Sequence, residues 1–86
     1  MDIKVLKKED NFLEAEVDAD IGLLKLIKDY LLENRSVEFA AVVRDHPFYK
    51  PRLIIRTKGK TTPAEALDKS IEKILSMTSA FTKHLK

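Results

Sequence analysis

The sequence contains no cysteine, so disulfide bonds cannot stabilise the fold. Its only histidines, His46 and His84, lie far apart and without ligand-like spacing, so we expect no structural metal. A chain of 86 residues buries only about 60–65% of the surface that its unfolded form exposes. With disulfides excluded and a metal not expected, its stability must come from a well-packed core or from a partner.

Glycine and long apolar runs are scarce too. Gly22 and Gly59 are the only glycines, which excludes a glycine-rich phosphate loop. No apolar run approaches the roughly 20 residues of a membrane span, and the N-terminus lacks a signal-peptide pattern. The net charge is +2, with acids and bases interspersed rather than gathered in a basic patch. We therefore expect a cytoplasmic protein with no membrane contact and little or no direct nucleic-acid contact.

Catalytic patterns are also missing. No serine or cysteine nucleophile has a plausible base nearby in sequence. Glu14 and Glu16 point to one strand face, which is typical of a solvated surface. His46 fits a structural hydrogen-bonding role, and residues 58–60 fit a charged connection better than a phosphate contact. We predict no catalytic, cofactor-binding or metal-binding residues, and no cofactor.

Four segments have the pattern of β-strands. Residues 3–7 and 13–17 flank a turn and predict a hairpin, the second with strict period-two alternation. Val37, Phe39, Ala41 and Val43 alternate with their neighbours, which predicts a third strand with these four on one face. Residues 53–57 alternate again, while two prolines between 45 and 51 exclude regular structure there.

Two segments have helical patterns. Asp20 is a plausible N-cap for a helix to about Asn34, whose apolar residues cover an arc of roughly 240°. A sheet covers only about 100–140° of a helix, so this helix has surplus apolar surface. Thr62, Pro63 and Glu65 predict the start of a second helix, which continues to about His84 and overhangs the sheet. Its apolar seam is Leu67, Ile71, Ile74, Thr78, Phe81 and Leu85.

The order of these elements predicts an α+β fold, ββαββα. We expect one domain over residues 1–86, with a four-stranded, mainly antiparallel sheet and both helices on one face. Both helices have more apolar surface than the sheet covers. The pattern therefore predicts a helical partner.

Four segments together resemble the L-subunit family of archaeal RNA polymerase. They are residues 1–7, residues 37–41 followed by Asp45-His46-Pro47, residues 51–59, and residues 62–67 opening a long helix that contains Met77-Thr78-Ser79. The order and spacing of these segments extend the resemblance over the whole chain. The first helix departs from the family pattern, because Ile21 and Gly22 stand where histidine and threonine are typical, and Lys25 follows in place of a further polar residue such as asparagine. A diverged paralogue would show the same departure.

The resemblance implies a dimerisation fold like the N-terminal domain of the bacterial alpha subunit. It also implies that the chain is a non-catalytic assembly subunit of DNA-directed RNA polymerase, which is a nucleotidyltransferase. Such a subunit pairs with the D subunit of the polymerase. The pair then joins subunits N and P and the large catalytic subunits. The surplus apolar helix surface suits such pairing. As interface residues we predict Leu23, Leu24, Ile27, Tyr30, Leu31, Ile74, Thr78, Phe81 and Leu85.

Two other interpretations remain open at the level of sequence. The element order also suits a free-standing homodimerising subunit, such as that of a tRNA-modification assembly, although residues 45–47 and 51–59 argue against it. An RNA-binding module would expose stacking aromatics on its strands, and only Phe39 lies clearly within a strand.

Overall fold

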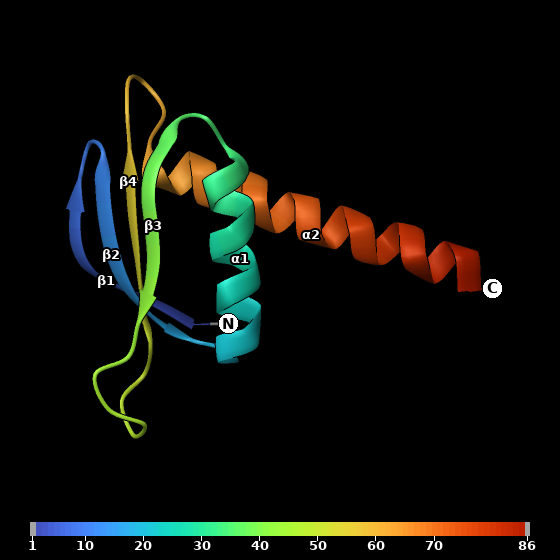
Figure 1. Ribbon diagram of the computed structural model, residues 1–86, viewed down its shortest axis with the longest axis horizontal. Helices are drawn as coiled ribbons and strands as arrows, with labels where there is room; N and C mark the ends of the chain where they lie inside the picture. The colour runs from blue at the N-terminus through green and yellow to red at the C-terminus, as the bar shows by residue number, and fades with distance from the viewer. Residues whose placement is uncertain (1, 86) are drawn as a thin grey trace.

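The chain folds into one antiparallel sheet with two helices, seen here in a computed structural model (Figure 1). The structure describes residues 2–85, with side chains described for residues 2–77. The elements follow the predicted ββαββα order. They are β1 (Asp2–Glu9), β2 (Phe12–Asp18), α1 (Ile21–Glu33), β3 (Val37–Val43), β4 (Arg52–Thr57) and α2 (Pro63–Leu85).

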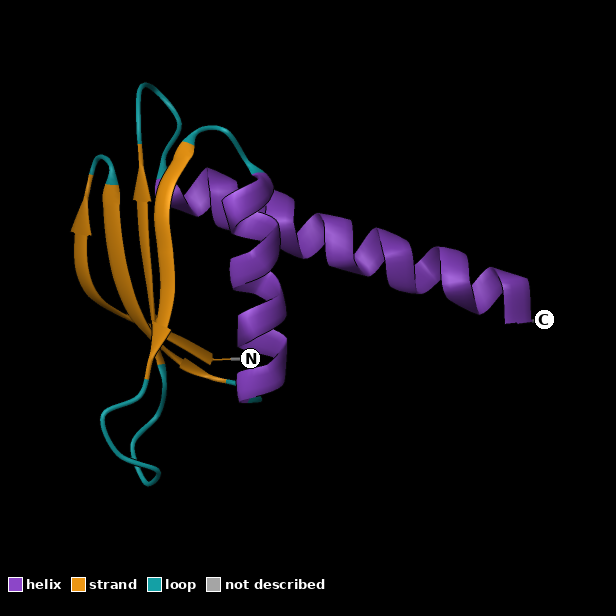
Figure 2. Ribbon diagram, in the orientation of Figure 1, coloured by secondary structure: helices purple, strands orange, loops and turns teal. Residues whose placement is uncertain are grey.

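The sheet order is β1-β2-β4-β3, and each neighbouring pair is antiparallel. β2 and β4 are therefore the central strands. Both helices lie on one side of the sheet, which leaves the opposite face without a covering layer (Figure 2). The predicted α+β class, with a four-stranded sheet and two helices on one face, is confirmed.

The register of β3 differs from the sequence prediction. Val37 pairs with Thr57 and Phe39 with Arg56, so a bulge at Glu38 breaks the alternation. Val37 and Ala40 are consequently buried under the helices, whereas Phe39 is exposed on the other face. The prediction that Val37 and Phe39 share one face was wrong, because an inserted residue reverses every side chain beyond it.

The core lies between the sheet and the helices. Leu24, Ile27 and Leu31 of α1 are 0–2% exposed and pack against the inward side chains of the strands. The inward strand residues are Leu13, Ala15, Val17, Val37, Ala40, Leu53 and Ile55. Within residues 2–77, every buried side-chain nitrogen and oxygen has a hydrogen-bond partner. This packing fixes which side of α1 faces the sheet.

Both helices begin where the sequence predicts. The Asp20 carboxylate accepts hydrogen bonds from the N–H groups of Gly22 and Leu23 at 3.0 and 3.3 Å. A Cβ atom on residue 22 would lie 2.9 Å from that carboxylate, so the glycine leaves room for the cap. The Thr62 hydroxyl accepts from the Glu65 N–H at 3.2 Å, which caps α2. These caps set the starting points of the two helices that form the candidate site.

The position of α2 is fixed at its N-terminal end. Asn11 Nδ2 donates to Thr57 Oγ1, Gly59 O and Thr61 O at 3.2–3.3 Å, which ties the β1–β2 turn to the connection that leads into α2. Gly59 has a φ of 70°, a conformation that favours glycine. From there α2 passes α1 and extends away from the sheet, as Figure 1 shows. The overhanging turns leave helix surface that the sheet does not cover.

Candidate partner interface

The core-facing side of α1 includes three of the predicted interface residues. Leu24, Ile27 and Leu31 are buried against the chain's own sheet. Their burial narrows the sequence prediction, because periodicity defined the apolar arc of the helix without showing which part the sheet covers. Leu24 and Leu31, at 0% exposed, have no surface left for a partner.

The flank of α1 that faces α2 remains partly open. Leu23 is 39% exposed and Leu26 is 42% exposed, and Tyr30 is half-buried on the same side of the helix. Leu32 is exposed too, but it lies nine residues after Leu23, about two and a half turns on, and so on the opposite flank. The exposed apolar surface of α1 therefore divides into two separate areas.

An apolar groove lies between the two helices. It has a volume of about 200 Å³, and every residue that lines it is apolar: Leu23, Ile27, Ile71, Ile74 and Leu75. We call it the α1–α2 groove. An apolar cavity of about 150 Å³ holds a benzene-sized molecule. The groove thus has room for one leucine or phenylalanine side chain from another protein.

Polar contacts join the two helices beside this groove. Lys73 Nζ donates to Glu33 Oε2 at 2.8 Å and lies 4.9 Å from the centre of the Tyr30 ring. The Tyr30 hydroxyl donates to Met77 Sδ at 2.7 Å. The hydrogen bond to Glu33 raises the pKa of Lys73 above its usual value. These exposed contacts join α1 and α2 beside the groove.

Of the interface residues predicted on α2, only Ile74 has a described side chain. Ile74 lines the groove and is half-buried, while the side chains of Thr78, Phe81 and Leu85 lie outside the described residues. Sequence reasoning missed Leu26, Leu75 and Met77, which are 42%, 61% and 54% exposed. Leu75 and Met77 fall beside the 4-3-4 seam rather than on it. The sequence pattern that could have predicted them is the full width of the apolar face on α2, which is wider than the seam alone.

The other sequence candidates lie elsewhere. His46 is in the β3–β4 connection, residues 58–60 lie in the turn before α2, and Glu14 and Glu16 are on the uncovered face of the sheet. Within the described residues, no three acidic or histidine side chains are close enough to hold a metal ion. No described helix has the length and apolar character needed to cross a membrane.

Comparisons with known proteins identify a matching family and several relatives. Residues 17–84 match the model of the family described as the RNA polymerase Rpb3/Rpb11 dimerisation domain. DNA-directed RNA polymerase subunit Rpo11 of Saccharolobus solfataricus is 39% identical over 88 aligned positions, covering 100% of this chain and 96% of that protein. Rpo11 of Thermococcus sibiricus is 41% identical over 78 positions, covering 86% of this chain and 82% of that protein.

A solved structure has the same fold. The crystal structure of DNA-directed RNA polymerase subunit L from Thermoplasma acidophilum superposes with a TM-score of 0.87 at 22% identity. The superposition covers 98% of this chain and 84% of that one. Both the sheet and the two helices therefore follow an architecture that is already known.

Proposed function

The chain belongs to the family of RNA polymerase Rpb3/Rpb11 dimerisation domains, and from this premise we propose that it is a non-catalytic assembly subunit of an archaeal-type DNA-directed RNA polymerase. Its role is to form a heterodimer within that polymerase. The observation that carries the mechanism is the α1–α2 groove, because it is lined only by apolar residues and lies on helix surface that the sheet leaves open. Burial of such surface drives association.

The interface of this heterodimer is centred on the groove. Leu23 and Tyr30 of α1, together with Ile74 of α2, are the predicted residues that lie at or beside it. Leu26, Leu75 and Met77 extend the apolar area. Thr78, Phe81 and Leu85 remain in the proposal on their sequence spacing alone. Leu24, Ile27 and Leu31 support this surface from beneath, and Ile27 also lines the groove.

For the partner we propose the D subunit of the polymerase, which contributes an apolar helix to the groove. The heterodimer then joins subunits N and P and the two large subunits, which carry the catalytic centre and contact the DNA. In this arrangement residues 1–86 act as one dimerisation domain in the cytoplasm. The homodimeric tRNA-modification alternative is not favoured, because the similar proteins from Saccharolobus and Thermococcus are RNA polymerase subunits.

Co-expression of the chain with an archaeal D subunit tests this proposal. The mass of the purified complex is measured by size-exclusion chromatography with light scattering. We expect a stable one-to-one heterodimer, with the chain alone poorly soluble or marginally stable because its groove is exposed. A stable homodimer that does not exchange with the D subunit would overturn the proposal.

A further inference from the structure

Sulfur is scarce in this chain, and one sulfur atom lies in an exposed side chain. The sequence has no cysteine, and its only methionines are Met1 and Met77. Met77 lies on α2 and is 54% exposed. In a protein without thiols, the thioether of methionine is the sulfur group that peroxides oxidise, and exposure favours the reaction. The side chain of Met77 is therefore open to oxidation while the chain is unpaired.

Met77 lies on the surface that we assign to the partner. It follows Ile74 by three residues, which places the two side chains on the same side of α2. Ile74 and Leu75 both line the α1–α2 groove. Oxidation of Met77 to the sulfoxide converts an apolar side chain into a polar one. The new oxygen atom would thus stand on apolar surface that the proposed heterodimer buries.

Two hydrogen-bond donors lie close to this side chain in the unpaired chain. The Tyr30 hydroxyl donates to Met77 Sδ at 2.7 Å. Lys73 precedes Met77 by one turn of α2, and its ammonium group lies 4.9 Å from the centre of the same tyrosine ring. A thioether sulfur is only a weak acceptor, whereas a sulfoxide carries a polar oxygen. The surroundings of Met77 therefore suit the oxidised side chain as well as the reduced one.

Pairing would change this balance. A polar oxygen that is buried against an apolar helix without a hydrogen-bond partner costs free energy. In the unpaired chain the same oxygen remains in solvent, beside the Tyr30 hydroxyl. The oxidised side chain is thus tolerated in the free chain and disfavoured at the interface. Conversely, a partner that covers Met77 would shield it from peroxide.

We propose that Met77 is a redox-sensitive modification site, at which oxidation to methionine sulfoxide by hydrogen peroxide weakens pairing with the D subunit. A lone pair of the sulfur attacks one oxygen of the peroxide, the O–O bond breaks and the S–O bond forms. The proton on the transferred oxygen moves to the departing hydroxide, which leaves as water. The sulfur loses two electrons and the peroxide gains them, so one sulfoxide and one water form. This inference rests on the proposed function.

The first part of the test measures reactivity. The wild-type chain is treated with hydrogen peroxide, both alone and as the heterodimer with the D subunit. Peptide mass spectrometry follows the addition of one oxygen atom and separates Met77 from Met1. We expect Met77 to be oxidised at least about tenfold faster in the free chain than in the heterodimer, because the partner covers it.

The second part measures binding to the D subunit by titration calorimetry, with Met77→Leu as the matched control that peroxide cannot oxidise at this position. Oxidised wild type should bind at least about tenfold more weakly than untreated wild type. Met77→Leu should bind equally well before and after the same treatment. Methionine sulfoxide reductases should restore the affinity of the oxidised wild type. Circular dichroism checks that the oxidised chain keeps its fold.

The outcomes separate the two proposals. Equal affinity of oxidised and untreated wild type, or equally slow oxidation of Met77 in the free chain and the heterodimer, would overturn the modification site and leave the heterodimer intact. A matching loss of affinity in peroxide-treated Met77→Leu would assign the effect to another residue and also overturn it. Failure of the untreated chain to bind the D subunit would overturn the proposed function and, with it, this role of Met77.

Discussion

The ammonium group of Lys73 in α2 lies 2.8 Å from the carboxylate of Glu33 in α1, and the same group lies over the ring of Tyr30. One side chain thus contacts two residues of the other helix. It does so at the border of the surface that we assign to the partner. A charge interaction therefore connects α1 and α2 in addition to their apolar packing.

The Lys73–Glu33 contact predicts a specific dependence of stability on pH. The folded-state pKa of Lys73 is raised, so its contribution is full below the ordinary value of 10.5 and is lost as pH rises through the raised pKa. Thermal unfolding should show Lys73→Met to be less stable than wild type at pH 8, with the difference shrinking above about pH 10.5.

Lys69→Met is the control for this experiment, because Lys69 lies one turn earlier on α2. No described carboxylate lies within 4.0 Å of Lys69. Its substitution should change the melting temperature at pH 8 less than Lys73→Met does. A Lys73→Met difference that stays constant from about pH 8 to about pH 11.5 would show that the contact does not act through charge.

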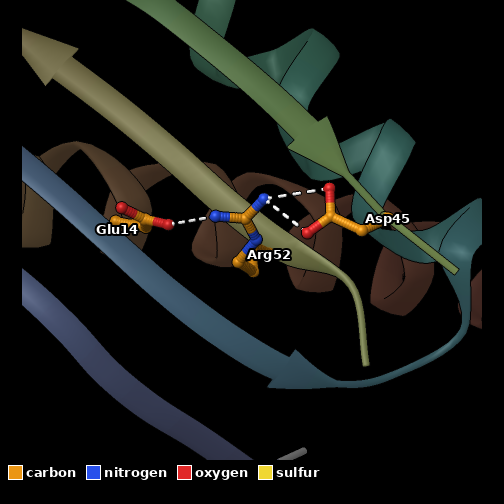
Figure 3. Close-up of polar contacts among 3 residues, drawn as sticks. All are labelled: Glu14, Asp45 and Arg52. Atoms are coloured by element: carbon orange, nitrogen blue, oxygen red, sulfur yellow. Dashed lines mark hydrogen bonds and ion pairs between the residues drawn. The ribbon is translucent and has the colours of Figure 1, made fainter. Parts of the chain in front are cut away.

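From the ion pairs of Arg52 we predict that this side chain stabilises the β3–β4 loop, residues 44–51. Arg52→Lys keeps the charge but loses the planar fork that reaches both Glu14 and Asp45 (Figure 3). We expect faster amide hydrogen exchange at Tyr49, whose N–H bonds to His46 O, and unchanged exchange at Ile55 in the core. Arg56→Lys is the control on the same strand, because Arg56 lies over Phe12 rather than beside the loop. Equal exchange at Tyr49 in both variants would contradict the bracing role of Arg52.

The division of α1 into a core side and an exposed flank predicts unequal effects on stability. Leu24→Ala removes a side chain that is 0% exposed and should lower the free energy of unfolding by about 2–5 kcal/mol. Leu26→Ala removes one that is 42% exposed and should change it by about 0.5 kcal/mol or less. Urea unfolding of both variants measures the difference. Similar losses for the two would show that the sheet covers a different side of α1.

Much of the fold could be predicted from the sequence because its signals are local. The alternation of Leu13, Ala15 and Val17 marks one buried face, and all three are buried. The cap at Thr62 likewise marked the start of α2. The inward face of β3 was harder to predict, because apolar residues occur on both of its faces. A bulge such as the one at Glu38 cannot be recognised in a pattern of this kind.

The candidate interface was less predictable, for a physical reason. Periodicity shows that a helix has a wide apolar arc, but tertiary packing decides which part of the arc the sheet covers. Leu24 and Leu23 are adjacent in sequence, yet one is 0% exposed and the other is 39% exposed. The groove also depends on Leu75, which becomes part of the surface only once α2 crosses α1. Such a relationship between distant residues is absent from local sequence patterns.

Two leucines on α1 provide the most direct test of the central claim, that the α1–α2 groove binds the D subunit. Leu23 lines the groove, whereas Leu32 is exposed on the opposite flank of the same helix. Because both are exposed, Leu23→Asp and Leu32→Asp should leave the fold intact, which circular dichroism checks. The first substitution would place a carboxylate in an apolar interface, while the second would leave its carboxylate in solvent.

Titration calorimetry with the purified D subunit gives the affinity of each variant. We predict that Leu23→Asp weakens binding by at least about tenfold, or ~1.4 kcal/mol, while Leu32→Asp binds like wild type. Wild-type affinity for Leu23→Asp, or an equal loss for both variants, would contradict the assignment of the groove as the interface.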